Sequence, residues 1–132
     1  MVRAIFDPDA GIDVSYIGLN GFRVSQLFGN LIIANHNAHV QTHLQVSIVG
    51  GESGTLTGQV FDPSATIQMQ MPTGLVTFRN VITYRAVTRG GDSGGALLQV
   101  DGSAALVVGT HIGGGGSMGV ASAVTRYQSR LP

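Results

Sequence analysis

The chain has 132 residues, enough for one compact domain, and 43% of them are hydrophobic. Charged residues make up 11%, and seven acidic and seven basic side chains balance to a net charge of zero, which argues against binding to nucleic acid or an anionic membrane through bulk charge. Without cysteine there are no disulfides and no thiolate metal sites. No apolar run approaches the ~18 residues of a membrane span. Asp7 and Asp9 interrupt any signal-peptide core, so a cytoplasmic location is expected.

Short apolar or alternating runs follow one another along the chain, separated by Gly, Asn, Asp and Pro. The predicted strands are Ile12–Leu19, Gly29–Ala34, Leu44–Val49, Leu56–Phe61, Thr66–Met71, Leu75–Arg85, Ala96–Val100, Ala105–Ile112 and Gly119–Ala123. Asp101 and Gly102 predict a tight hairpin turn between two of them. Only Ala121–Arg130 suggests a short helix at its end. Strands at this spacing predict a single all-β domain, a barrel or a sandwich.

The segment Gly91–Gly95 reads Gly-Asp-Ser-Gly-Gly between a long β-run and the predicted hairpin. Acyl transfer needs a nucleophile beside two converging backbone N–H donors that hold the oxyanion. A loop that turns the N–H groups of Gly91 and Ser93 toward the Ser93 hydroxyl meets that need, and glycine at position 91 permits the required backbone conformation. The segment is similar to the nucleophile loop of chymotrypsin-fold proteases. The alternative is a glycine-rich β-turn without chemistry, because Asp-Ser-Gly is common in loops.

A longer match narrows this resemblance. Residues 80–98 and 107–127 resemble the picornavirus-type 3C-like main proteases, which show Tyr-x-x-x-Thr-x-x-Gly-x-Cys-Gly-Gly followed by a Gly-x-His-x-Gly-Gly-x-Gly strand. The matching positions are Tyr84, Thr88, Gly91, Gly94, Gly95, Gly109, His111, Gly113, Gly114, Gly116 and Gly119. The usual nucleophile of that family is cysteine, and Ser93 stands in its place. Serine here fits either a natural serine enzyme or a replaced cysteine.

The resemblance implies a fold, a domain organisation and a substrate pocket. The fold is an all-β, chymotrypsin-like antiparallel β-barrel, with residues 43–132 as the second barrel and residues 1–42 as a remnant of the first barrel and a linker. His111 and Thr88 would line the pocket for the residue before the cleaved bond (P1), where a neutral imidazole can recognise a glutamine carboxamide. Residues 112–114, that is Ile112, Gly113 and Gly114, would pair with the substrate backbone. Alternatively, His111 is a structural residue and residues 113–116 form a flexible loop.

A catalytic triad also needs a base and an acid that orients it. Residues 12–19 resemble the Asp-Val/Ile-Ala-Leu strand of chymotrypsin-fold proteases, so Asp13 is the candidate acid. Its distance along the chain from Ser93 suits a linker plus the front half of a second barrel. The alternative is an ordinary surface carboxylate at a strand start. In this alignment the catalytic histidine precedes Asp13, and no histidine does so in this sequence.

A second alignment makes His36 the base, because residues 31–36 resemble the strand that presents the catalytic histidine in related proteases. Asp62 would then be the acid, although the segment between His36 and Ser93 is short for this arrangement. His36, His39 and His43 could instead be solvated residues. A metal site is disfavoured, because no carboxylate accompanies them. Arg23, in a segment like an RNA-binding one of picornavirus proteases, lacks the accompanying Lys and Asp, so no nucleic-acid partner is expected.

Three hypotheses follow. The first is a serine endopeptidase that acts on a peptide or polyprotein substrate, after Gln, without a cofactor or metal. The second is a catalytically inactive protease-like barrel that works as a binding or scaffold module. The third is a fragment that needs a complementing N-terminal half, or another copy of the chain in a homo-oligomer, to supply the histidine.

Overall fold

The computed structural model describes residues 2–18 and 26–131, and their secondary structure is almost entirely β. The strands are β1 (Val2–Asp7), β2 (Ile12–Ile17), β3 (Leu27–Phe28), β4 (Leu31–His36), β5 (Gln45–Gly50), β6 (Gly54–Met71), β7 (Gly74–Arg85), β8 (Ala96–Asp101), β9 (Ala104–Gly115) and β10 (Met118–Ala123). The short helices are η1 (Pro8–Ala10), α1 (Val124–Tyr127) and η2 (Gln128–Arg130). The all-β prediction is confirmed, and so is the short helix after the last predicted strand. Within the described ranges, no helix is long and apolar enough to cross a membrane.

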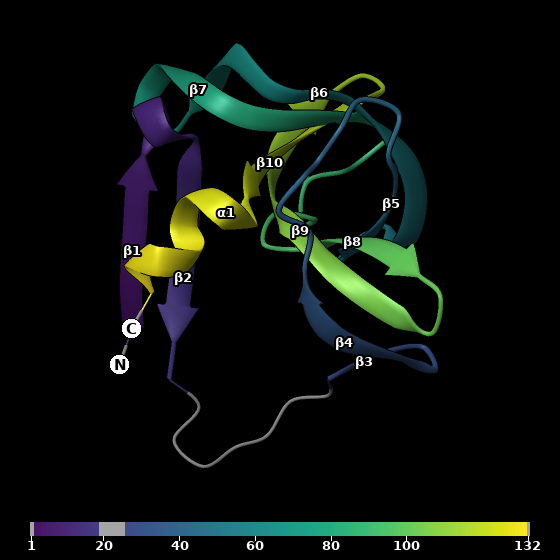
Figure 1. Ribbon diagram of the computed structural model, residues 1–132. Coiled ribbons are helices and arrows are strands. Elements are labelled where there is room, and N and C mark those ends of the chain that lie inside the picture. The colour runs from purple at the N-terminus through teal and green to yellow at the C-terminus, as the bar shows by residue number, and fades with distance from the viewer. Residues whose placement is uncertain (1, 19–25, 132) are drawn as a thin grey trace.

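Strands β5 to β10 close into a barrel (Figure 1). The order β10-β7-β6-β5-β8-β9 is joined end to end by a further β9–β10 pairing, and every neighbouring pair in this ring is antiparallel. The predicted hairpin between β8 and β9 is present, with a two-residue turn at Gly102 and Ser103. Closure leaves these strands without a long open edge.

The barrel interior is filled by side chains from alternate positions of its strands. One cluster of buried residues includes Ile48, Val60, Tyr84 and Leu97, and a second is built around Phe78. In β7 the run 81–84 is buried at every position, which brings both faces of that strand into contact with the rest of the protein. The barrel therefore has a core sufficient to fix the loops attached to it.

The segment 54–71 forms one long strand, β6, where two strands with a break were predicted. The ladder between β6 and β7 shifts register between Val60 and Ile67. Such bulges accommodate the extra residues and Pro63, which lacks a backbone N–H for the ladder. Pro63 correctly indicates an irregularity in this stretch, but the pairing of β6 with β7 continues on both sides of it.

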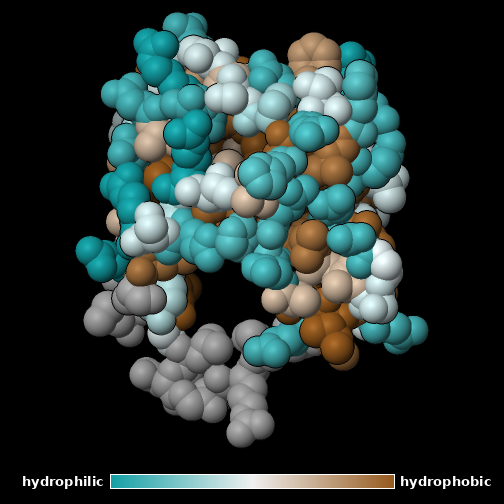
Figure 2. All heavy atoms as spheres, in the orientation of Figure 1, coloured by the Kyte–Doolittle hydropathy of each residue, from teal (hydrophilic) through white to brown (hydrophobic). Residues whose placement is uncertain are grey.

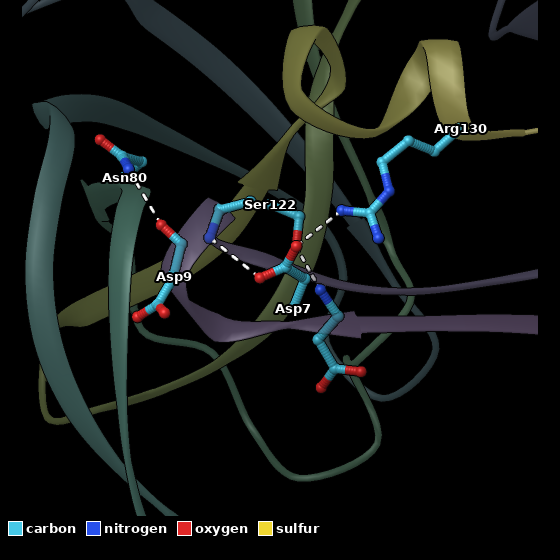
Figure 3. A network of polar contacts seen from close by, with 7 residues as sticks. Asp7, Asp9, Asn80, Ser122 and Arg130 are labelled. Atoms are coloured by element: carbon cyan, nitrogen blue, oxygen red, sulfur yellow. Dashed lines mark hydrogen bonds and ion pairs between the residues drawn. The ribbon is translucent and has the colours of Figure 1, made fainter.

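Strands β1 and β2 form a separate two-stranded sheet beside the barrel (Figure 1). Its apolar face packs with α1 through Ile5, Ile12, Val124 and Tyr127. Polar contacts also attach it. The Asn80 amide donates to the Asp9 carbonyl (3.0 Å) and Arg130 pairs with Asp7 (2.8 Å), as Figure 3 shows. The Asp13 N–H donates to the Ser122 hydroxyl (3.0 Å), and Arg79 pairs with Asp9 (3.7 Å). These contacts fix the position of the hairpin on the barrel.

Strand β4 extends the sheet next to the barrel, because it pairs in parallel with the first part of β9 and antiparallel with β3. Hydrophobic side chains gather on the surface here, and Leu27 and Ile32 are 53% and 59% exposed (Figure 2). The predicted strand end at Leu19 and the segment containing Arg23 lie outside the described residues.

Candidate active site

The loop that contains Ser93 joins β7 to β8 and is bound to β9 at its end. The Gly94 N–H donates to the His111 carbonyl and the His111 N–H donates to the Gly95 carbonyl, both at 2.9 Å. Gly91 and Gly94 have φ angles of 97° and 87°, in the region that side chains resist. The two glycines therefore let the chain turn sharply on either side of Ser93.

The Ser93 side chain lies on the surface, at the end of this turn. Its hydroxyl donates to the Ile112 carbonyl oxygen at 2.8 Å. The backbone N–H groups of Gly91 and Ser93 have no acceptor among residues 2–18 and 26–131. Two unpaired donors and an exposed hydroxyl in one short loop are the elements that an oxyanion site requires.

The side chain next to Ser93, Asp92, points inward and is completely buried. Four donors surround its carboxylate: the N–H groups of Glu52, Ser53 and Arg89, and the Ser53 hydroxyl at 2.6 Å. These hydrogen bonds, the Ser53 hydroxyl first among them, hold the pKa of Asp92 well below its usual range. Asp92 is therefore an anion inside the protein, fixed directly beside the candidate nucleophile.

His111 is buried in β9, and its Nδ1 is hydrogen-bonded to the Tyr84 hydroxyl from β7. Burial lowers the pKa of His111, and the charge of Asp92 opposes this only in part. Burial and the same charge raise the pKa of Tyr84. The pair therefore consists of a neutral imidazole and a neutral phenol at pH 7. Gly119 on β10 makes room for it, because a Cβ there would overlap the Tyr84 ring.

Beyond Thr110, β9 loses its partner β8 while keeping β10 on the other side. Within the described ranges, residues 113–115 thus present a backbone edge that no strand covers. Thr88 lies close to this segment, since a Cβ placed on Gly114 would come within 3.2 Å of the Thr88 Oγ1. The structure brings Thr88, His111 and the Gly113–Gly114 edge together with Ser93, and an open edge can accept an extended peptide by strand addition.

One cavity of about 540 Å³ connects this loop with the β1–β2 hairpin. Its lining includes Ser93 and His111 from the barrel side and Asp13 from β2. Burial raises the pKa of Asp13 above its ordinary value. Thr110 and Tyr127 also line the cavity, with their hydroxyl oxygens 2.9 Å apart. Asp13 and Ser93, distant in sequence, therefore face the same space.

The other histidines lie elsewhere. His36 is on β4 opposite Val107 and is not among the residues that line the Ser93 cavity. The side chains of His39 and His43 line a second cavity of about 430 Å³ with Gln99. Asp62, the acid of the alternative alignment, accepts from the Ser64 N–H. In the part of the chain that the structure describes, no group of three His, Cys, Asp or Glu side chains could hold a metal ion.

Two residues of this site received no role from the sequence. Tyr84 matched the family pattern, but only the structure shows its bond to His111; the signal available was a tyrosine in an apolar β-run, whose hydroxyl needs a partner when buried. Asp92 gave no signal, because three of its four donors are backbone N–H groups. Backbone donors have no sequence signature.

No family model matches this sequence. Solved structures do resemble it. The Nocardiopsis protease matches with a TM-score of 0.74 at 19% identity, over 96% of this chain and 68% of that one. The chymotrypsin of Cellulomonas bogoriensis matches with a TM-score of 0.62 at 24% identity, over 77% of this chain and 54% of that one. The murine norovirus NS6 protease, in an inactive form, matches with a TM-score of 0.52 at 19% identity, over 70% of this chain and 56% of that one. The chain thus has the predicted chymotrypsin-like all-β fold and spans about half the length of several such proteases.

Proposed function

We propose that this chain carries the nucleophile and the acid of a chymotrypsin-type serine endopeptidase. The observation that carries the proposal is that Ser93 and Asp13 line one cavity, although Ser93 lies in the β7–β8 loop of the barrel and Asp13 on β2 of the separate hairpin. Only the packing of the β1–β2 hairpin against the barrel brings them there. The unpaired N–H groups of Gly91 and Ser93 beside the hydroxyl support the same function.

The chemistry assigned to these groups is acyl transfer. A base in the cavity takes the Ser93 proton as the hydroxyl oxygen attacks the scissile carbonyl, and the Gly91 and Ser93 N–H groups bind the oxyanion that forms. Asp13 orients the base and stabilises its protonated form. The base then protonates the leaving amine, and water releases the acyl group by the same route. In the structure the Ser93 hydroxyl donates to the Ile112 carbonyl, so it must rotate before it can bond the base.

The base in this proposal is a histidine from a complementing segment of the first barrel, seated between Asp13 and Ser93. The shared cavity supports this assignment, because it offers a volume far larger than an imidazole ring. Residues 1–42 are then a remnant of the first barrel and a linker, and residues 43–132 are the second barrel. The competing assignment, His36 as base, requires it to reach Ser93 from β4.

For specificity we propose glutamine at P1. The raised pKa of Tyr84 keeps its phenol protonated. A phenol that donates to Nδ1 of a neutral His111 places the ring proton on Nε2, which can then donate to a carboxamide oxygen. Thr88 supplies a second polar group near the same edge. Cleavage after Gln suits viral polyprotein processing.

The test of catalysis is labelling by a fluorophosphonate, with and without free imidazole in place of the missing base. Imidazole should raise the labelling rate of the wild type, and Ser93→Ala should abolish labelling. Asp13→Asn should reduce the rescue, because imidazole is then no longer oriented. Ser103→Ala, on the exposed β8–β9 turn, is the matched control. Labelling that persists in Ser93→Ala would refute the proposal.

The test of specificity compares peptides that differ only at P1. Binding or cleavage should favour Gln over both Glu and Met, and His111→Val should remove that preference while the protein stays folded. A preference for Glu would mean that His111 acts as a cation, contrary to the neutral state assigned to it.

A second candidate function is that of an inactive protease-like binding module. It is favoured by the bond of the Ser93 hydroxyl to the Ile112 carbonyl and by the absence of a histidine bonded to that hydroxyl among the described residues. A module of this kind would bind a Gln-containing peptide along the Gly113–Gly115 edge and never cleave it. Titration calorimetry with such a peptide, followed by mass spectrometry of the recovered peptide, separates binding from turnover.

A further inference from the structure

Asp92 is the most deeply buried charged group in the described part of the chain, with 0% of its surface exposed. The Oδ1 atom accepts from the N–H groups of Glu52 (3.0 Å) and Ser53 (2.8 Å). The Oδ2 atom accepts from the Ser53 hydroxyl (2.6 Å) and the Arg89 N–H (2.8 Å). Each oxygen is thus bound twice, and three of the four donors come from a turn remote in sequence.

That turn joins β5 to β6 and packs directly onto the nucleophile loop. A Cβ placed on Gly50 would overlap the Asp92 carboxylate, and one on Gly51 would come within 2.9 Å of the Gly91 carbonyl oxygen. In the other direction, a Cβ on Gly91 would lie 3.3 Å from the Glu52 Cβ. The two loops therefore fit together only with glycine at their points of contact.

No Lys or Arg side chain forms an ion pair with Asp92 within the described ranges. The charged and titratable groups nearest it are Glu52 and Arg89, which offer it their backbone N–H groups, and Tyr84 and His111, which sense its charge. A buried carboxylate requires such donors, and loss of one is felt strongly because nothing else neutralises the charge.

We propose that Ser53 is a positioning residue: its hydroxyl, through Asp92, holds residues 89–94 in the conformation that presents the Ser93 hydroxyl and the oxyanion donors. Residues 50–53, the end of β5 and the turn that follows, then determine the conformation of the nucleophile loop. The effect on loop structure stands on the contacts alone, whereas the effect on turnover rests on the proposed function.

The structural arm of the test is amide hydrogen exchange of the folded chain. Ser53→Ala keeps the backbone donor and removes only the hydroxyl. Because hydrogen bonds to charged groups are the stronger ones, we expect exchange at Glu52 and Arg89, whose N–H groups donate to the Asp92 carboxylate, to accelerate roughly tenfold or more. Ser53→Thr, which keeps the hydroxyl, should restore protection, and Ser103→Ala should leave it unchanged. Unaltered exchange in Ser53→Ala would overturn the proposal.

A pH series, first on the unmodified protein and then on Ser53→Ala, tests the four hydrogen bonds to the Asp92 carboxylate, here called the Asp92 clamp. Asp92 has a lowered pKa in the folded state. The stability that its carboxylate contributes to the fold is therefore present above pH 3.8, the ordinary pKa, and is lost as the pH falls through the pKa of the folded state. Protection of the Glu52, Ser53 and Arg89 amides should then fail together on acidification, and in Ser53→Ala it should fail at a higher pH. Independent loss at the three amides would refute a common clamp.

The catalytic arm uses imidazole-rescued labelling by the fluorophosphonate. Ser53→Ala should lower the maximal labelling rate at least tenfold and leave the probe concentration for half-saturation nearly unchanged. The acid limb of the plot of labelling rate against pH should move to higher pH. An unchanged rate together with faster exchange would overturn the link to Ser93. If the wild type shows no labelling, the proposed function fails, and the exchange experiments alone decide on the clamp.

Discussion

The candidate site joins two regions that are stabilised in different ways. The loop that contains Ser93 belongs to a closed barrel, is bound to β9 by backbone hydrogen bonds and is anchored by the buried Asp92 carboxylate with its four donors. The β1–β2 hairpin, which carries Asp13, is a separate two-stranded sheet held by a small apolar cluster and by partly exposed polar contacts. Two-stranded sheets are marginal on their own. We infer that the barrel fixes Ser93, the proposed nucleophile, while the position of Asp13, the proposed acid, depends on a weaker attachment.

The largest expected effect is in the barrel. Phe78 is fully buried in β7, so Phe78→Ala should lower the free energy of unfolding by about 3–5 kcal/mol. Leu75→Ala in the same strand, where the side chain is 63% exposed, should change it by less than about 0.5 kcal/mol. Urea denaturation followed by circular dichroism measures both. A small loss for Phe78→Ala would contradict the view that the barrel is the stable region.

The next effect is the pH dependence of the barrel. The pKa of His111 lies below its ordinary 6.5, so on acidification the unfolded chain takes up a proton before the folded one does. Below pH 6.5 this single group should therefore reduce the free energy of unfolding by at most about 1.4 kcal/mol per pH unit. The NMR titration midpoint of the His111 Cε1 proton should fall below 6.5, and the slope should disappear in His111→Gln. A midpoint above 6.5 would mean that the imidazole is charged in the barrel.

A smaller effect is expected in the hairpin. Phe6 is 53% exposed and meets the Phe78 ring edge-on, with ring centroids 5.9 Å apart. Phe6→Ala should cost about 0.5–1.5 kcal/mol. If the two regions are as distinct as inferred, amide exchange will accelerate in β1 and β2 and not in β5–β10. Equal acceleration throughout the protein would show that the hairpin and the barrel unfold as one unit.

The smallest effect is expected for the ion pair between Arg130 and Asp7. Arg130 lowers the pKa of Asp7, but both side chains are partly exposed, so water and salt screen the pair. Arg130→Gln should leave the urea midpoint within error of the wild type in 0.15 M salt, with Arg126→Gln, at an exposed position of α1, as the control. A loss as large as that of Phe6→Ala would show that the pair, rather than the apolar cluster, holds the hairpin.

The sequence predicts the barrel strands well because their burial alternates or runs continuously, and the signal is local. It misses β1, since Val2–Asp7 mixes polar and apolar residues and is stabilised by pairing with β2. It also divides β6 at Pro63, because a proline signals a break and the continuing partner strand cannot be seen from local residues.

The same distinction applies to the site. Ser93, Thr88 and His111 fall in recognisable patterns, and the structure gathers them around one edge of β9. The bond between Tyr84 and His111 depends on the pairing of distant strands, and the Asp92 clamp depends on backbone N–H groups of a turn. Both are products of tertiary packing, which no single stretch of sequence records.

Closure of the barrel has a consequence for synthesis of this chain on a ribosome. Strand β10 pairs with both β7 and β9, so a nascent chain that has emerged only through residue 115 has two unsatisfied strand edges. Exposed edges of this kind pair readily with other chains. Residues 113–115 of β9 lie on one of these edges, and the opposite edge of the same residues is the one proposed to receive substrate. Translation that pauses before Met118 is therefore the stage at which a chaperone would protect this protein most.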